Sequence, residues 1–214
     1  MTNQEFDLIQ EQEALTWNIE DKVKRDEKIR REVARYPMMA KQMGLIGRYQ
    51  CIDTSDMVIW DIGSSCTRGL SKILPCKSRL CIDPNKEAYS KYFNVSNFSD
   101  EKGEDLKEKL NEPDMILITN ALDHFQDPES FLNDLVKYMK YGAYFVHFHA
   151  IDNAIQHVHP AHKYNLNEEI VNNIMNNDFE LVWQMNYKDD GLIYGWLKEK
   201  SFCQIWRRIN EPKF

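Results

Sequence analysis

Beyond residue 56 the sequence alternates between short apolar runs and segments that suit helices, and this alternation limits the possible folds more than any other feature. The apolar runs are MVIWDI (57–62), RLCI (79–82), MILIT (115–119) and AYFVHFH (143–149). The helix-compatible segments between them are 68–74, 86–92, 105–110 and 129–139. Strands that alternate with helices form parallel sheets covered on both faces. The sequence therefore predicts an α/β fold built on a mostly parallel sheet.

Two further runs near the C-terminus predict a different kind of strand pairing. FELVWQMNY (179–187) and FCQIWRRI (202–209) lie on either side of KDDG, which is a turn signal. We expect them to form a C-terminal antiparallel pair.

The N-terminal part is polar and rich in charge, and its apolar residues are spaced as in helices. Two stretches repeat an apolar residue at every fourth position, namely Leu15, Ile19 and Val23, and then Ile29 and Val33. Two helices are expected, ending near Tyr36–Pro37. The run DKVKRDEKIRREVAR offers acid and base pairs four residues apart, which favours a solvated helix face over a nucleic-acid patch. We expect a helical extension over residues 1–50 and a main domain over residues 51–214.

Composition excludes several classes of protein. A chain of 214 residues with 43% hydrophobic residues can bury one sizeable core. The net charge of -7 argues against a broad phosphate-binding face, although a small local RNA site stays open. Neither a signal-like N-terminus nor a membrane-length apolar run is present, so we expect a cytoplasmic chain. The five cysteines are odd in number and lack the two-residue gap of zinc or redox motifs, which favours reduced thiols.

The ends of the first two apolar runs carry the candidate binding residues, because ligands of such sheets bind beyond the carboxyl ends of the strands. Asp61 and then Gly63, Ser64 and Ser65 follow the first run. A carboxylate there is costly to desolvate without a partner, so a cation such as a ligand ammonium is expected. Asp83 ends the second run, where an acid can accept hydrogen bonds from ribose hydroxyls. Its alternative role is to cap the helix that follows Pro84.

At this point the sequence resembles the class I S-adenosylmethionine-dependent methyltransferases, over residues 57 to about 187. The resemblance rests on MVIWDIGSSCTRG, on RLCIDPN and on PDMILITNALDHFQDPESFLNDLVKYMKYGAYFVHFH. It implies a Rossmann-like seven-stranded sheet with helices on both faces, and S-adenosyl-L-methionine as cofactor, with S-adenosyl-L-homocysteine as product.

The resemblance also implies a role for each candidate residue. It assigns Asp61, Gly63, Ser64 and Ser65 to the methionine end of the cofactor, Asp83 and Pro84 to the ribose, Glu104 (or Asp105) to the adenine amino group, and Asn120, Ala121 and Leu122 to the sulfonium. The sequence departs from the family pattern at its third strand, which is weak and lies somewhere within residues 94–98, and in two loops. Ser65 and Thr67 stand where glycine is common, and KYGA (140–143) replaces the more familiar Lys-Pro-Gly-Gly.

Histidines are concentrated in the half of such a domain that faces the methyl acceptor. All six lie between residues 124 and 162: His124, His147, His149, His157, His159 and His162. Strand alternation predicts that His147 and His149 share a face. Three interpretations stay open. The histidines are buried and hydrogen-bonded or on the surface; His124 or His149 is a general base, with Asp123 as orienting partner or alternative base; or His147, His149 and HVHPAH hold a metal. Spacing alone does not fix a metal geometry, and no metal is predicted.

The expected function is transfer of a methyl group to a small molecule, sugar or glycan precursor, at oxygen. The absence of a basic stripe, and NALD in place of a Pro-Pro-Tyr-like tetrapeptide, argue against nucleic acid. A non-catalytic methyltransferase-like binding subunit and an RNA-directed methyltransferase remain alternatives. A nicotinamide oxidoreductase is disfavoured because G-x-G-x-x-G is missing. The N-terminal helices, with Trp17 and Tyr36, are expected either to fold over the site or to pack on the sheet edge.

Overall fold

Seven strands form one sheet in the order β3-β2-β1-β4-β5-β7-β6. In the computed structural model, the described residues are 7–8, 10–12, 15, 20–34, 36–151, 166–187 and 200–212. The strands are β1 (Val58–Ile62), β2 (Ser78–Ile82), β3 (Phe98–Ser99), β4 (Met115–Thr119), β5 (Tyr144–Ile151), β6 (Phe179–Tyr187) and β7 (Lys200–Arg208). The expected seven-stranded Rossmann-like sheet is confirmed.

Strands β1 to β5 are parallel, and only β7 runs against its neighbours. The expected antiparallel pair of β6 and β7 is confirmed, and β7 lies between β5 and β6. Strand order reverses between β1 and β4, because β2 and β3 continue to one side of β1 and β5 to the other side of β4. The carboxyl ends of β1 and β4 are therefore the place where a ligand is expected to bind.

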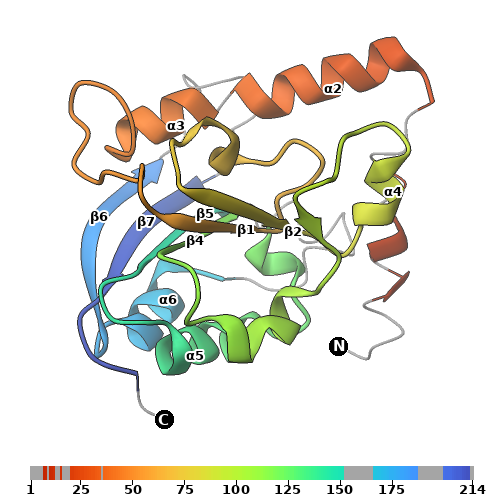
Figure 1. Ribbon diagram of the computed structural model, residues 1–214. Coiled ribbons are helices and arrows are strands. Elements are labelled where there is room, and N and C mark those ends of the chain that lie inside the picture. Colours follow the sequence, from red (N-terminus) through yellow and green to blue (C-terminus); the bar gives the residue numbers. More distant parts are fainter. Residues whose placement is uncertain are drawn as a thin grey trace.

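Helices cover both faces of the sheet, with α2 and α3 on one side and α5 and α6 on the other (Figure 1). The bounds are α2 (Lys22–Ala34), α3 (Tyr36–Gln42), α4 (Lys86–Ser90), α5 (Pro128–Tyr138) and α6 (Glu168–Met175). Three short 3₁₀ helices lie in the loops: η1 (Leu70–Ile73), η2 (Gly103–Lys109) and η3 (Leu122–His124). The helices expected at 68–74 and 105–110 are thus only 3₁₀ turns, since Gly69 and Pro75 leave little room around the first.

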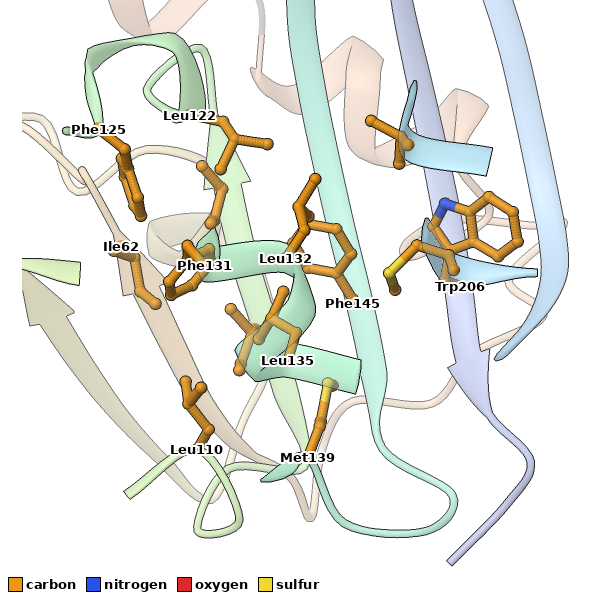
Figure 2. Close-up of a cluster of buried hydrophobic side chains, with 14 of the residues drawn as sticks. Ile62, Leu110, Leu122, Phe125, Phe131, Leu132, Leu135, Met139, Phe145 and Trp206 are labelled. Carbon is orange, nitrogen blue, oxygen red and sulfur yellow. The ribbon is translucent and has the colours of Figure 1, made fainter. Parts of the chain in front are cut away.

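The core is divided by the sheet into two clusters, because successive side chains of a strand point to opposite faces. Trp60 belongs to the cluster under α5 and α6, and its neighbour Ile59 belongs to the cluster under α3. Figure 2 shows how α5 fills the first cluster. The residues labelled there are Ile62, Leu110, Leu122, Phe125, Phe131, Leu132, Leu135, Met139, Phe145 and Trp206.

Helix α3 is part of the core and begins where a helix was expected to end. Pro37 lies in its first turn, where the missing amide hydrogen of proline costs no hydrogen bond. The helix end expected near Tyr36–Pro37 fits α2, which ends at Ala34, whereas α3 was not expected. Buried side chains of this stretch, Tyr36, Met39, Ala40, Met43 and Leu45, pack with Ile59, Leu117 and Ile205 of the sheet. One hydrophobic cluster thus crosses the domain boundary expected at residue 50.

All five cysteines are free thiols. None of the helices in the described part of the chain has the length and apolarity needed to cross a membrane.

Candidate functional site

The loops that follow β1 and β4 touch each other at Gly63 and Ala121. Gly63 has φ +69°, and a Cβ atom added to it would lie 2.3 Å from the Cβ of Ala121. Any side chain at this position would clash with the neighbouring loop and force a backbone conformation that L residues rarely adopt. The close approach of the two loops at this edge of the sheet therefore depends on a glycine at residue 63.

Asp61, at the end of β1, is completely buried. Its Oδ2 accepts a hydrogen bond from the amide of Ser71 at 3.4 Å, and Oδ1 has no hydrogen-bond partner among the described residues. Burial raises the pKa of this carboxyl group to about 7, against the opposing effects of the Ser71 hydrogen bonds and the positive charge of Arg79. A buried acid with an unsatisfied oxygen is electrostatically costly, and a cationic partner would relieve that cost.

Left-handed backbone lets the first loop wrap tightly around the end of β1. Besides Gly63, the non-glycine residues Ser65 and Arg68 have φ of +50° and +61°. Ser65 Oγ and Thr67 Oγ1 are 2.9 Å apart and share a hydrogen bond. Arg68 donates to the carbonyl of Asn94 at 2.7 Å and so ties the loop to the segment before β3. Side-chain hydrogen bonds thus help to hold the shape of this loop.

Asp83 joins the first loop to the segment after β2. Its Oδ2 accepts from the amide of Ser65 at 2.9 Å, and its Oδ1 accepts from the amide of Asn85 at 3.0 Å. Pro84 is half-buried between them, and Asn85 stands at the N-cap position of α4 without a side-chain capping hydrogen bond. The alternative role expected for Asp83, as cap of this helix, is therefore wrong, and Asp83 instead makes an Asx turn before it. The same carboxylate also fixes the first loop.

The side chain of Glu104, in η2, reaches the loop after β4. Its Oε1 accepts from the amide of Gln126 at 2.6 Å. Burial raises the pKa of the Glu104 carboxyl above its ordinary value, although the amides of Glu104 and Gln126 act in the opposite direction. The adjacent Gly103 lies flat against Phe125, whose ring a Cβ atom would approach to 2.5 Å. The candidate adenine residue is thus held close to the loop that carries the other candidates.

The loop after β4 contains the candidates for the sulfonium end and for catalysis. Asn120 has φ +55° and donates its amide to the carbonyl of Phe148 at 2.7 Å, which anchors the loop on β5. Ala121 and Leu122 are buried. Asp123 is buried, and its Oδ1 lies 3.8 Å from Nε2 of His124, an ion-pair distance that is too long for a hydrogen bond. The side chain of His124 is 17% exposed, and its Nε2 atom is buried.

The remaining histidines are placed very differently from one another. His147 is fully buried in β5, and its Nε2 is 2.8 Å from Oε1 of Gln204. His149 lies two residues further along β5, paired with Phe202, and its side chain falls outside the described residues. His157, His159 and His162 also fall outside them. Within the described part of the chain, no group of three or more His, Cys, Asp or Glu side chains could hold a metal ion.

Four partners of the candidate residues were not expected from the sequence. Ser71 bonds Asp61, Gln126 bonds Glu104, Asn85 bonds Asp83, and Gln204 bonds His147. Three of them, Ser71, Gln126 and Asn85, contribute a backbone amide, for which no residue type is required. Only Gln204 contributes a side chain.

Four carboxylates, Asp61, Asp83, Glu104 and Asp123, thus follow strands or lie in loops at one edge of the sheet. An acidic edge of this kind suits a ligand with positive charge.

No protein-family model matches the sequence, and no curated protein matches it at a significant level. Solved structures with the same fold are numerous. A protein described as a methyltransferase, in complex with the Trm112 methyltransferase activator of Haloferax volcanii, has a TM-score of 0.63 at 12% identity, over 92% of this chain and 98% of that chain. The N-methyltransferase NodS of Bradyrhizobium japonicum WM9 in complex with S-adenosyl-L-homocysteine has a TM-score of 0.57 at 13% identity, over 94% and 100%.

A SAM-dependent methyltransferase of Methanosarcina mazei has a TM-score of 0.57 at 15% identity, over 82% of this chain and 99% of that chain. The chain therefore shares the fold of S-adenosylmethionine-dependent methyltransferases over nearly its whole length.

Proposed function

We propose that the protein is an S-adenosylmethionine-dependent methyltransferase that acts on an oxygen atom of a small molecule, sugar or glycan precursor. One observation carries the proposal: Asp83, at the carboxyl end of β2, holds the amide of Ser65 in the loop after β1, beside the point where strand order reverses. This arrangement puts one carboxylate between the two loops that receive a nucleoside in sheets of this topology.

The side chains at this edge fit the chemistry of the cofactor. S-Adenosylmethionine carries an ammonium, a sulfonium, a ribose diol and an adenine amino group, and each of these favours an acceptor or an acid. Asp61 has an oxygen with no partner among the described residues, and a nearby ammonium would favour its charged form. Asp83 and Glu104 supply acceptors for the ribose and the adenine, and the close contact of Gly63 with Ala121 keeps side chains out of the reversal point.

When bound, the cofactor supplies an electrophilic methyl group on a positively charged sulfur. The protein positions an acceptor oxygen in line with that methyl group, which is the main source of rate enhancement in such transfers. A hydroxyl acceptor would lose its proton on receiving the methyl group, with the neutral thioether as the leaving group. We assign that proton to His124 or His149, with Asp123 as orienting partner or alternative base. Replacing both histidines by alanine should lower turnover by about 10²- to 10⁴-fold, with the affinity for S-adenosylhomocysteine unchanged.

Calorimetry with S-adenosylhomocysteine tests the cofactor assignment directly. The Asp83→Ala variant should bind it at least about tenfold more weakly, because hydrogen bonds to charged groups are worth about 1.5–3 kcal/mol. Asp53→Ala is the matched control, since Asp53 lies before β1 and its carboxylate bonds the nearby Ser55. If the wild-type protein ignores both the cofactor and its product, the proposed function is wrong.

The alternative of a non-catalytic binding subunit has one observation in its favour. The left-handed residue at position 65 is a serine, so the first loop holds its shape without the usual glycine. Because one similar structure contains a methyltransferase with an activator protein, activity of this chain could depend on a partner. A protein that binds S-adenosylhomocysteine but transfers no labelled methyl group to any small hydroxyl acceptor, alone or in cell extract, would support the alternative.

A further inference from the structure

The N-terminal segment is attached to both loops that carry the candidate nucleoside residues. Asn85 donates its side-chain amide to Oε1 of Gln10 at 3.2 Å, and Lys102 pairs with Asp7 at 3.0 Å. Asn85 is two residues beyond Asp83, and Lys102 is two residues before Glu104. Figure 1 shows this red segment next to α4. The described residues 7–8 and 10–12 therefore bridge the segment after β2 and the segment after β3.

The bridge continues a chain of hydrogen bonds that starts in the first loop. The amide of Ser65 donates to Asp83, the amide of Asn85 donates to the same carboxylate, and the side chain of Asn85 donates to Gln10. Asn85 is only 9% exposed, so its amide group is placed between Asp83 and Gln10 with little freedom. A ligand held by Asp83 would therefore be linked to Gln10 of the N-terminal segment through Asn85.

Two further contacts guide the chain from this segment to α2. Glu20 lies 4.0 Å from Lys91 at the end of α4, and the guanidinium of Arg25 stacks 4.2 Å from the ring of Tyr92. The N-terminal contacts thus all run to the part of the domain around α4 and η2, whereas the catalytic candidates lie in the loop after β4 and in β5.

We infer that residues 7–8 and 10–12 and the facing Lys102 form a wall of the nucleoside site, in which Gln10 and Lys102 retain the bound cofactor. This inference rests on the proposed function and specifies it: the N-terminal segment controls release of the nucleoside product. The contacts are polar and partly exposed, with Asp7 62% exposed, so each is weak. A weakly held wall can open for product release and close again without unfolding the domain.

The dissociation rate of S-adenosylhomocysteine, measured by surface plasmon resonance on the full chain, tests the inference. Gln10→Ala and Lys102→Glu should each release the product about 3- to 10-fold faster, as expected for weak polar contacts. The paired variant Asp7→Lys/Lys102→Glu restores the ion pair with reversed charges and should bring the rate back to within about twofold of wild type. Lys24→Glu is the matched control, because it makes the same charge change in α2, where Lys24 contacts only Asp21.

A second measurement separates retention from simple packing. Amide hydrogen exchange of residues 7–12 should slow when S-adenosylhomocysteine is added, which a purely structural contact would not produce. Wild-type release rates in Gln10→Ala and Lys102→Glu, or a reversed pair that stays fast, would overturn the inference while leaving the cofactor assignment intact. Failure of the wild-type chain to bind S-adenosylhomocysteine would overturn the proposed function and this inference together.

Discussion

Asp61 is closely enclosed by its neighbours, and its burial makes its charged form electrostatically costly. It lies in a strand whose neighbours Ile59, Trp60 and Ile62 are all buried, and it is itself fully buried. Gly69 passes so close that an added Cβ would lie 3.0 Å from Oδ2 of Asp61. The carboxylate therefore shapes the turn into η1 and at the same time lowers the stability of the protein when it is charged.

The pH dependence of stability should report this residue. Because the pKa of Asp61 is raised to about 7 in the folded state, its contribution to the free energy of unfolding is greatest below about pH 4 and is lost as pH rises toward 7. Above that pH the Asp61→Asn variant should be more stable than wild type by roughly 2–4 kcal/mol, since one pKa unit corresponds to about 1.4 kcal/mol.

Urea denaturation at pH 4.5 and pH 8 measures this difference. The two proteins should differ much less at the lower pH, and the stabilised variant should bind S-adenosylhomocysteine more weakly. If the difference in the free energy of unfolding between the two proteins is the same at both pH values, the charge of Asp61 does not cause it.

At the level of elements, α3 and α5 cover opposite faces of the sheet and are held by different means. Asp127 caps α5 by accepting a hydrogen bond from the amide of Ser130 at 2.9 Å, and Pro128 begins the helix. The residues around the start of α5 are therefore enough to explain where it begins. Helix α3 has only seven residues and depends on the packing of Met39 and Ala40 against the sheet.

Truncations should separate the N-terminal elements. Removing residues 1–20 deletes no side chain of the hydrophobic clusters in the described part of the chain, so the thermal midpoint should fall by less than about 3 °C. Removing residues 1–43 deletes Tyr36, Met39 and Met43 and should unfold the protein, because each large core deletion costs about 2–5 kcal/mol. Circular dichroism on heating checks both. A cooperative transition at the wild-type temperature after the longer deletion would instead support an independent domain from residue 51.

For the whole molecule, a buried polar row ties the antiparallel strands to the parallel ones. His147, Gln204 and Gln184 are neighbours across β5, β7 and β6. The indole N–H of Trp206 can only donate, so the atom of Gln204 that it contacts at 3.1 Å is the oxygen, and His147 donates its Nε2–H to the same oxygen. The amide nitrogen of Gln204 then donates to Asn172 on α6 at 2.8 Å and to Gln184 at 3.1 Å.

Removing the centre of this row should destabilise the fold. Gln204→Leu leaves the buried donors of His147 and Trp206 without this acceptor, at a cost of about 2–5 kcal/mol in the free energy of unfolding. Gln184→Leu is the control, because Gln184 is half-buried at the edge strand, and the change should cost less than about 1.5 kcal/mol. Chemical denaturation measures both values. Equal costs would show that the row is not centred on Gln204.

The sequence by itself determined the elements and the residues at the strand ends. The positions of β1, β2, β4 and β5 follow from runs of apolar residues that must leave water, and Asp61 and Asp83 stand out because an acid at the end of such a run needs a reason. These are local signals, carried by residue type and spacing. Where local signals were weak, as at β3 with its two residues, or where Gly69 shortened a helix, the expected bounds were inexact.

Only the tertiary structure decided which distant segments meet. The insertion of β7 between β5 and β6, the contact of Gly63 with Ala121, and the pairing of Gln10 with Asn85 join residues far apart in the chain. Many partners in these contacts are backbone amides or ordinary polar side chains, which any sequence contains in number. Their meeting depends on the free energy of packing the whole sheet and its helices together, and no short stretch of sequence carries that information.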